Sequence, residues 1–120
     1  MRWILLICAV FLVPIGVSAA PNLTVERALW GFSGKAIPEA FNILTIEVRN
    51  ASAEPYQGVI QLVKTLGSRS VGIPEIHPIG LAPGGARTVQ FTPYIDAQVD
   101  VYEWRVDWKN GSMELGDLGI

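Results

Sequence analysis

Apolar residues recur at every second position in two stretches of the chain, 44–48 and 58–62, with a short polar segment between them. A two-residue period is typical of a β-strand that buries one face and exposes the other. Because few residues separate the stretches, the pattern predicts two neighbouring strands joined by a turn, in a firmly fixed register. The residues assigned to the buried face are Leu44, Ile46, Val48, Ile60 and Leu62.

Two more strands are predicted in the C-terminal half. "LAPGGARTVQF" (81–91) places a turn rich in Pro and Gly before Val89 and Phe91, which alternate with polar residues. In "VDVYEWRVDWK" (99–109), aromatic or apolar residues alternate strictly with charged ones over eight positions. A helix is the alternative, because apolar residues also recur there at helical spacing, but the β-branched and aromatic composition favours a strand. The expected buried face carries Tyr102, Trp104, Val106 and Trp108.

Shorter candidates complete the prediction. "LTVERALWGF" (23–32) and "SMELG" (112–116) are possible strands, whereas "GIPEIHPIGL" (72–81), with two prolines and two glycines, reads as a stretch rich in loops. About six or seven strands with regularly spaced turns predict an all-β fold, an antiparallel, immunoglobulin-like β-sandwich.

The first 19 residues have the composition of a cleavable signal peptide. Arg2 is followed by about 15 apolar residues and by the small residues of "VSAA", with cleavage expected after Ala19. A membrane span is the alternative, but it needs about 20 apolar residues, and Pro14 interrupts this run. The sequence therefore predicts a signal peptide at 1–19, one β-sandwich domain at 20–120, and no membrane span after signal removal.

Export and charge narrow the class of protein further. The only cysteine, Cys8, lies in the predicted signal peptide, so the mature domain forms no disulfide, which favours a bacterial extracytoplasmic protein. The whole chain has a net charge of −2, and losing Arg2 would leave 8 basic against 11 acidic residues, a charge of −3. No basic patch is evident, so nucleic acid is not an expected partner.

The order of these segments resembles a known group of modules. "WGFSGKAIPEAFNILTIEVRN", "EPYQGVIQL", "LAPGGARTVQF" and "YEWRVDW" follow one another as in the immunoglobulin-like or fibronectin type III-like (CARDB-like) modules of bacterial surface proteins. More narrowly, "GFSGKAIPEAFNILTIEVRN" and "YQGVIQL" resemble the N-terminal sandwich of uncharacterised bacterial envelope proteins, in which a larger extracytoplasmic region and a membrane anchor follow. The resemblance implies a sandwich fold at the cell envelope and supplies no catalytic residues.

Candidate catalytic and metal-binding residues do not form a recognisable set. His77 and Glu75 could bind zinc only with further ligands, and we expect His77 to be a loop residue. Ser68 and Ser70 lack the Gly-x-Ser-x-Gly elbow of a hydrolase, and "GFSGKA" lacks the spacing of a phosphate-binding loop. Glu103 and Asp107 would lie about 13 Å apart along a strand, too far for a glycosidase pair. We therefore expect no enzyme activity, no cofactor and no metal.

The expected positions of the tryptophans are compatible with two functions. Trp104 and Trp108 share a face with Val106 and are assigned to the core, whereas Trp30 could lie in the core or on the surface and is the weak candidate for ligand binding. The first interpretation is an exported, non-catalytic module with a structural, adhesion or protein-interaction role at the bacterial cell envelope. The alternative is a carbohydrate-binding or enzyme-accessory domain that uses exposed aromatic residues. The expected partner is a protein or a cell-surface glycan.

Three Asn-x-Ser/Thr triplets suggest where the chain is exposed. They begin at Asn22, Asn50 and Asn110, and their composition is typical of turns. We expect all three positions to be exposed.

Overall fold

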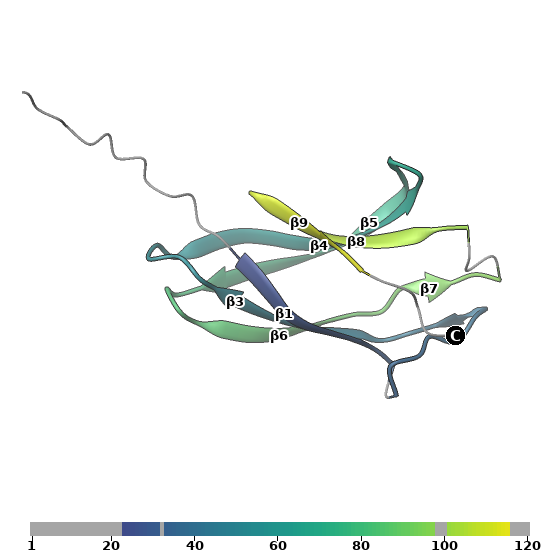
Figure 1. Cartoon of the computed structure of the whole chain (residues 1–120), viewed down its shortest axis with the longest axis horizontal. Helices are drawn as coiled ribbons and strands as arrows, with labels where there is room; N and C mark the ends of the chain where they lie inside the picture. Colours follow the sequence, from purple (N-terminus) through teal and green to yellow (C-terminus); the bar gives the residue numbers. More distant parts are fainter. Residues whose placement is uncertain (1–22, 32, 98–100, 116–120) are drawn as a thin grey trace, which may run out of the picture.

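The fold is an antiparallel β-sandwich, seen in a computed structural model that describes residues 23–31, 33–97 and 101–115. Figure 1 shows its two layers. One sheet has the order β1-β3-β6 and consists of β1 (Leu23–Trp30), β3 (Leu44–Asn50) and β6 (Ala86–Phe91). The other has the order β5-β4-β8-β9 and consists of β4 (Tyr56–Leu66), β5 (Arg69–Leu81), β8 (Glu103–Trp108) and β9 (Gly111–Glu114). The predicted all-β sandwich is confirmed, while the predicted signal peptide at 1–19 lies outside the described residues.

A two-stranded ribbon extends the first sheet at one end of the sandwich. It consists of β2 (Ala40–Phe41) and β7 (Tyr94–Ile95), which the sequence pattern did not predict. Its register continues that of β3 and β6, because Leu44 lies opposite Phe91 and, three residues further, Phe41 lies opposite Tyr94. Pro93, which has no N–H group, lies in the interruption between the two pairings. The ribbon is therefore a continuation of the sheet and not a separate unit.

The core lies between the two sheets and contains the residues that the alternation assigned to it. Leu44, Ile46, Val48, Ile60 and Leu62 are all buried, as are Val89, Phe91, Trp104 and Val106. The side chains at 44–48 on β3 and at 60–62 on β4 belong to one hydrophobic cluster. The predictions are confirmed at these positions, whereas Tyr102 and Trp108, which were assigned to the same buried face, are half-buried.

The predicted pairing of the first two strands is wrong. β3 pairs with β1 and β6, whereas β4 pairs with β5 and β8, so β3 and β4 lie in opposite sheets. The connection at 51–55 crosses from one layer to the other. Alternation shows that a strand has one buried face, but it does not distinguish a hairpin from a connection between two facing sheets.

The stretch "GIPEIHPIGL" is a strand and not a loop. It forms most of β5, an edge strand that pairs only with β4. Prolines are tolerated on an edge strand because the missing N–H would otherwise point to solvent, so Pro74 and Pro78 do not break it. They also make this edge less able to pair with another strand. His77 is consequently a strand residue, opposite Ile60.

One predicted exposed position is buried. The side chain of Asn50 has 0% exposure, because it is enclosed by the connections at the end of the sandwich away from the ribbon. Asn110 is exposed in the turn between β8 and β9, and Asn22 lies outside the described residues. The Asn-x-Ser triplet therefore indicates a turn correctly at 50–52 but does not indicate exposure.

In the part of the chain that the structure describes, no helix has the length and apolar character needed to cross a membrane.

Candidate binding cleft

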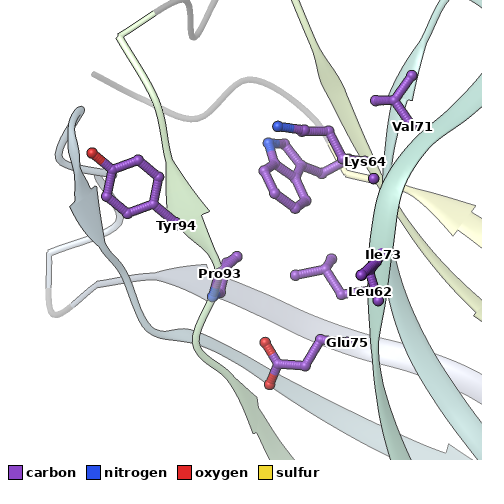
Figure 2. A pocket seen from close by; sticks show the side chains of 9 residues that line it. Leu62, Lys64, Val71, Ile73, Glu75, Pro93 and Tyr94 are labelled. Carbon is purple, nitrogen blue, oxygen red and sulfur yellow. The ribbon is translucent and has the colours of Figure 1, made fainter.

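A cleft of about 250 Å³ opens at the end of the sandwich that carries the β2–β7 ribbon. We call it the end cleft (Figure 2). Strands of both sheets contribute to it, so its walls are held by the hydrogen-bonding ladders of the fold. Its lining residues are Leu62, Lys64, Val71, Gly72, Ile73, Glu75, Pro93, Tyr94 and Trp104.

One wall is a bulge in β5. Leu62 pairs with Glu75 but Lys64 pairs with Val71, so Gly72, Ile73 and Pro74 together lie opposite Val63 alone. Gly72 has φ = +75°, a conformation that residues with a Cβ rarely adopt. The bulge leaves Ile73 96% exposed at the cleft. Bulges redirect side chains beside binding sites, and this one presents an aliphatic residue to solvent.

A cation lies in the cleft on β4. The Nζ of Lys64 is 3.6 Å from a carboxylate oxygen of Asp96, 4.4 Å from the ring centroid of Tyr102 and 5.9 Å from that of Trp104. An ammonium within about 6 Å of an aromatic face is attracted by the ring electrons. The charge of Lys64 is therefore held in position, while its side chain keeps 26% exposure.

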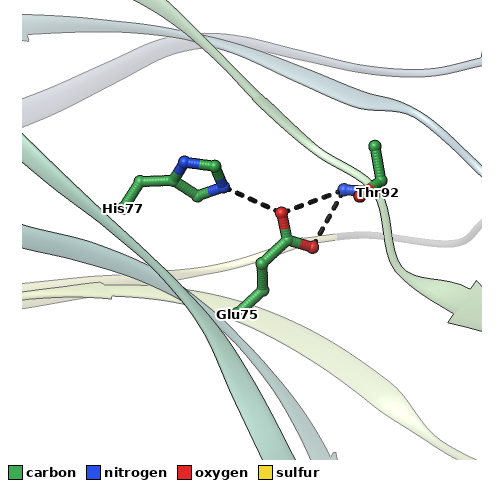
Figure 3. Close-up of polar contacts among 3 residues, drawn as sticks. All are labelled: Glu75, His77 and Thr92. Atoms are coloured by element: carbon green, nitrogen blue, oxygen red, sulfur yellow. Dashed lines mark hydrogen bonds and ion pairs between the residues drawn. The ribbon is translucent and has the colours of Figure 1, made fainter.

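An anion, Glu75, lines the same cleft and links the two sheets (Figure 3). The backbone N–H of Thr92 donates to both carboxylate oxygens, at 2.9 and 3.1 Å, and Nε2 of His77 lies 2.8 Å from Oε2. The His77 ring also contacts Phe91 edge to face, with centroids 4.9 Å apart. These contacts connect the edge of β5 to the end of β6 and fix the orientation of the Glu75 carboxylate.

Exposed apolar side chains form a rim beside the cleft. Phe41 and Tyr94 lie opposite each other on the ribbon, with ring centroids 5.2 Å apart in an edge-to-face arrangement. They are 75% and 48% exposed, and Ile37 is also exposed on the preceding loop. We call Ile37, Phe41 and Tyr94 the rim; an exposed apolar cluster of this kind is typical of interaction surfaces.

Asn42 holds the loop that presents the rim. Its Oδ1 accepts a hydrogen bond from the N–H of Ile37, and its Nδ2 donates to the carbonyls of Ile37 and Ala40. Within this loop Glu39 has φ = +57°, which is uncommon for a residue other than glycine. A strained residue fixed by a buried amide indicates that the loop has one preferred conformation.

Trp30, the candidate from the sequence, does not lie on an exposed face. It is 6% exposed and packs edge to face against Trp104, with ring centroids 6.0 Å apart. The ring of Trp30 is therefore not exposed for a ligand to stack on. Trp104 and Trp108 contribute to the core as predicted, and Trp104 also lines the end cleft.

The other candidate residues from the sequence lie in a turn, in a strand or in an ion pair. Among the described residues, no group of three or more His, Cys, Asp or Glu side chains is placed to hold a metal ion. Ser68 lies in the two-residue turn between β4 and β5, and Ser70 is the second residue of β5. Asp107 forms a bidentate pair with Arg105 at 2.6 and 3.0 Å, and this hydrogen bonding raises the pKa of Arg105. Asp107 is thus engaged in an ion pair on the outer face of its sheet.

The sequence did not reveal the end cleft. Its lining residues are 42 positions apart along the chain at the extremes, and they come from four strands and from Pro93, which lies between β6 and β7. Three signals were nevertheless present: the Gly-Ile-Pro sequence at 72–74 that makes the bulge, the lone Pro93 at a strand end, and the aromatic residue Tyr94 after it. Such signals identify a bulge or a strand end but not which strands meet there.

Comparisons with known proteins agree with the fold. No family model matches the sequence, and no curated protein is significantly similar to it. Among solved structures, the chain is similar to a cycloisomaltooligosaccharide glucanotransferase of Paenibacillus sp. in complex with cycloisomaltoheptaose, with 24% identity and a TM-score of 0.52. The match covers 79% of this chain but 12% of the glucanotransferase chain. At this identity the similarity concerns the fold: this chain is a β-sandwich like one region of a much larger protein.

Proposed function

We propose that the chain is an exported, non-catalytic β-sandwich module that adheres to a component of the bacterial cell envelope through its end cleft and rim. The observation that carries this proposal is the grouping of exposed apolar residues at one end of the sandwich, where Ile73 borders the cleft and Phe41 and Tyr94 form the rim. Exposed apolar residues gathered beside a cleft favour binding. The extracytoplasmic location rests on the signal-peptide composition of residues 1–19.

The strand order supports the kinship with immunoglobulin-like and fibronectin type III-like modules. In the immunoglobulin fold, strands A, B and E share one sheet and C, F and G share the other. Taken in chain order, β1, β3 and β6 here occupy the positions of A, B and E, and β4, β8 and β9 those of C, F and G. The end cleft lies at the end opposite the β3–β4 connection (51–55), so it does not correspond to the B–C and F–G loops that carry the binding residues of immunoglobulin variable domains.

A carbohydrate-binding or enzyme-accessory role is the second candidate. It is favoured by the composition of the end cleft, where Tyr94 and Trp104 accompany one cation and one anion. It is also compatible with the similarity of the fold to a region of a glucanotransferase whose structure contains a cyclic oligosaccharide. Both candidates use the same end of the molecule.

The proposal is tested by co-sedimentation with isolated bacterial envelopes. The full chain is expressed in a bacterium, and the exported protein is purified. Ile73→Ser should reduce the bound fraction several-fold, because it removes the exposed apolar residue of the bulge. Ile76→Ser is the matched control, because Ile76 is an exposed isoleucine of the same strand that does not line the cleft. Equal loss in both variants, or retention of the protein in the cytoplasm, would contradict the proposal.

A further inference from the structure

We infer that the end cleft binds one uncharged sugar ring of an envelope glycan. This inference rests on the proposed function and specifies the ligand of the same site. It follows from three properties of the cleft: its volume, the balance of charge on its walls, and the hydrogen-bonding capacity that its charged groups retain.

The volume limits the ligand to a small unit. Sites that enclose drug-sized ligands measure roughly 300–1,000 Å³, and the end cleft at about 250 Å³ is smaller. Two of its lining residues, Ile73 and Tyr94, are exposed, so a longer chain can extend out of the cleft past them. One ring of a polymer can therefore lie inside while its neighbours remain outside.

The charges on the walls favour a neutral ligand. The lining contains one ammonium, Lys64, and one carboxylate, Glu75. An anionic ligand in so small a cleft would be repelled by Glu75 and a cationic one by Lys64. An apolar side chain would remove water from both charged groups without replacing their hydrogen bonds, which is unfavourable. A neutral ligand with hydroxyl groups avoids all three costs.

Both charged groups can still bind hydroxyls. Among the described residues, Oε1 of Glu75 accepts one hydrogen bond, from the N–H of Thr92, and a carboxylate has about four lone-pair positions. Lys64 has three N–H donors, and its contact with Asp96 at 3.6 Å is an ion pair longer than a typical hydrogen bond. The contacts to Thr92, His77 and Tyr102 fix these groups before a ligand arrives, which lowers the entropy lost on binding.

The apolar walls of the cleft complement the apolar C–H faces of a sugar ring. The C–H faces of a sugar ring can pack against the aromatic residue Trp104 and the aliphatic residues Leu62 and Ile73, whereas the ring of Tyr94 points away from these side chains (Figure 2). A ring that is polar at its edge and apolar on its faces thus complements a cleft that presents both charged groups and apolar side chains.

Isothermal titration calorimetry with the full chain tests the inference. The probes are a panel of uncharged oligosaccharides, including isomalto- and cello-oligosaccharides, an oligomer of uronic acid and an oligomer of glucosamine. We expect binding of at least one uncharged probe and at least tenfold weaker binding of both charged probes. Glu75→Gln and Lys64→Met should each weaken the uncharged probe about 10- to 100-fold, the loss expected for a hydrogen bond to a charged group.

The two variants should also change the preference in opposite directions. Glu75→Gln removes the carboxylate that lines the cleft and should improve binding of the uronic acid oligomer, whereas Lys64→Met removes the ammonium and should improve binding of the glucosamine oligomer. Ile76→Ser should bind like the unmodified protein. If no uncharged probe binds, or if both variants bind it unchanged, the inference is wrong. Envelope binding that remains sensitive to Ile73→Ser but is abolished by protease treatment of the envelopes would show a protein partner, leaving the proposed function intact.

Discussion

The side chain of Asn50 forms four hydrogen bonds at the end of the sandwich opposite the cleft. Its Nδ2 donates to the carbonyls of Glu54 and Leu81, and its Oδ1 accepts from the N–H and the Oγ of Ser52. A buried amide is tolerated because its polar atoms are satisfied. The sequence indicated a turn here, but burial depends on Leu81, a residue 31 positions away that no local pattern associates with Asn50.

Asn50→Ala should lower the free energy of unfolding by about 1–3 kcal/mol, because the buried carbonyl of Leu81 would lose its side-chain donor. Urea unfolding of the purified protein measures this change. Asn110→Ala is the matched control, since Asn110 is exposed, and it should change the free energy by about 0.5 kcal/mol at most. Equal effects of the two substitutions would contradict the buried hydrogen-bond network.

At the level of elements, alternation predicted buried residues in the strands that it detected, and it failed where pairing depends on distant residues. The buried positions of β3, β4, β6 and β8 were predicted because burial of one face has a local signature. The strand β5 was missed because its two prolines mimic a loop, although an edge strand accepts them. The β2–β7 ribbon was missed because two-residue strands have no detectable period.

Replacement of one buried residue of β3 tests its assigned face. Ile46→Ala should lower the free energy of unfolding by about 2–5 kcal/mol, because Ile46 has no exposed surface and its removal leaves a cavity. Glu47→Ala, on the opposite face of the same strand, should change it by about 0.5 kcal/mol. Chemical unfolding of both variants measures these changes. An unchanged midpoint for Ile46→Ala would mean that the buried and exposed faces of β3 have been assigned the wrong way round.

The conformation of the loop before β3 depends on Asn42. Asn42→Ala removes three hydrogen bonds and should increase amide hydrogen exchange at residues 37–41 without increasing it in β4 or β8. Asn42→Asp keeps the acceptor for the N–H of Ile37 but loses both donors, so its exchange should be intermediate. Exchange that rises equally throughout the chain would show that Asn42 stabilises the whole fold and not this loop.

For the whole molecule, the two ends of the sandwich have different properties. The end near Asn50 is closed by internal hydrogen bonds, whereas the other end contains the cleft, a bulge and the exposed rim. The fold class could be predicted from composition and period. The position of the cleft could not, because it arises where β4, β5, β7 and β8 meet, and strand order is not encoded in any one segment.

The most direct test of binding at the cleft end is hydrogen exchange of the full chain, measured by mass spectrometry with and without isolated bacterial envelopes. Binding at the cleft end should slow exchange at residues 71–75 and 92–95 when envelopes are present, with no change at 51–54 and 82–85 at the opposite end. Slower exchange confined to the opposite end, or no difference at either end, would contradict it.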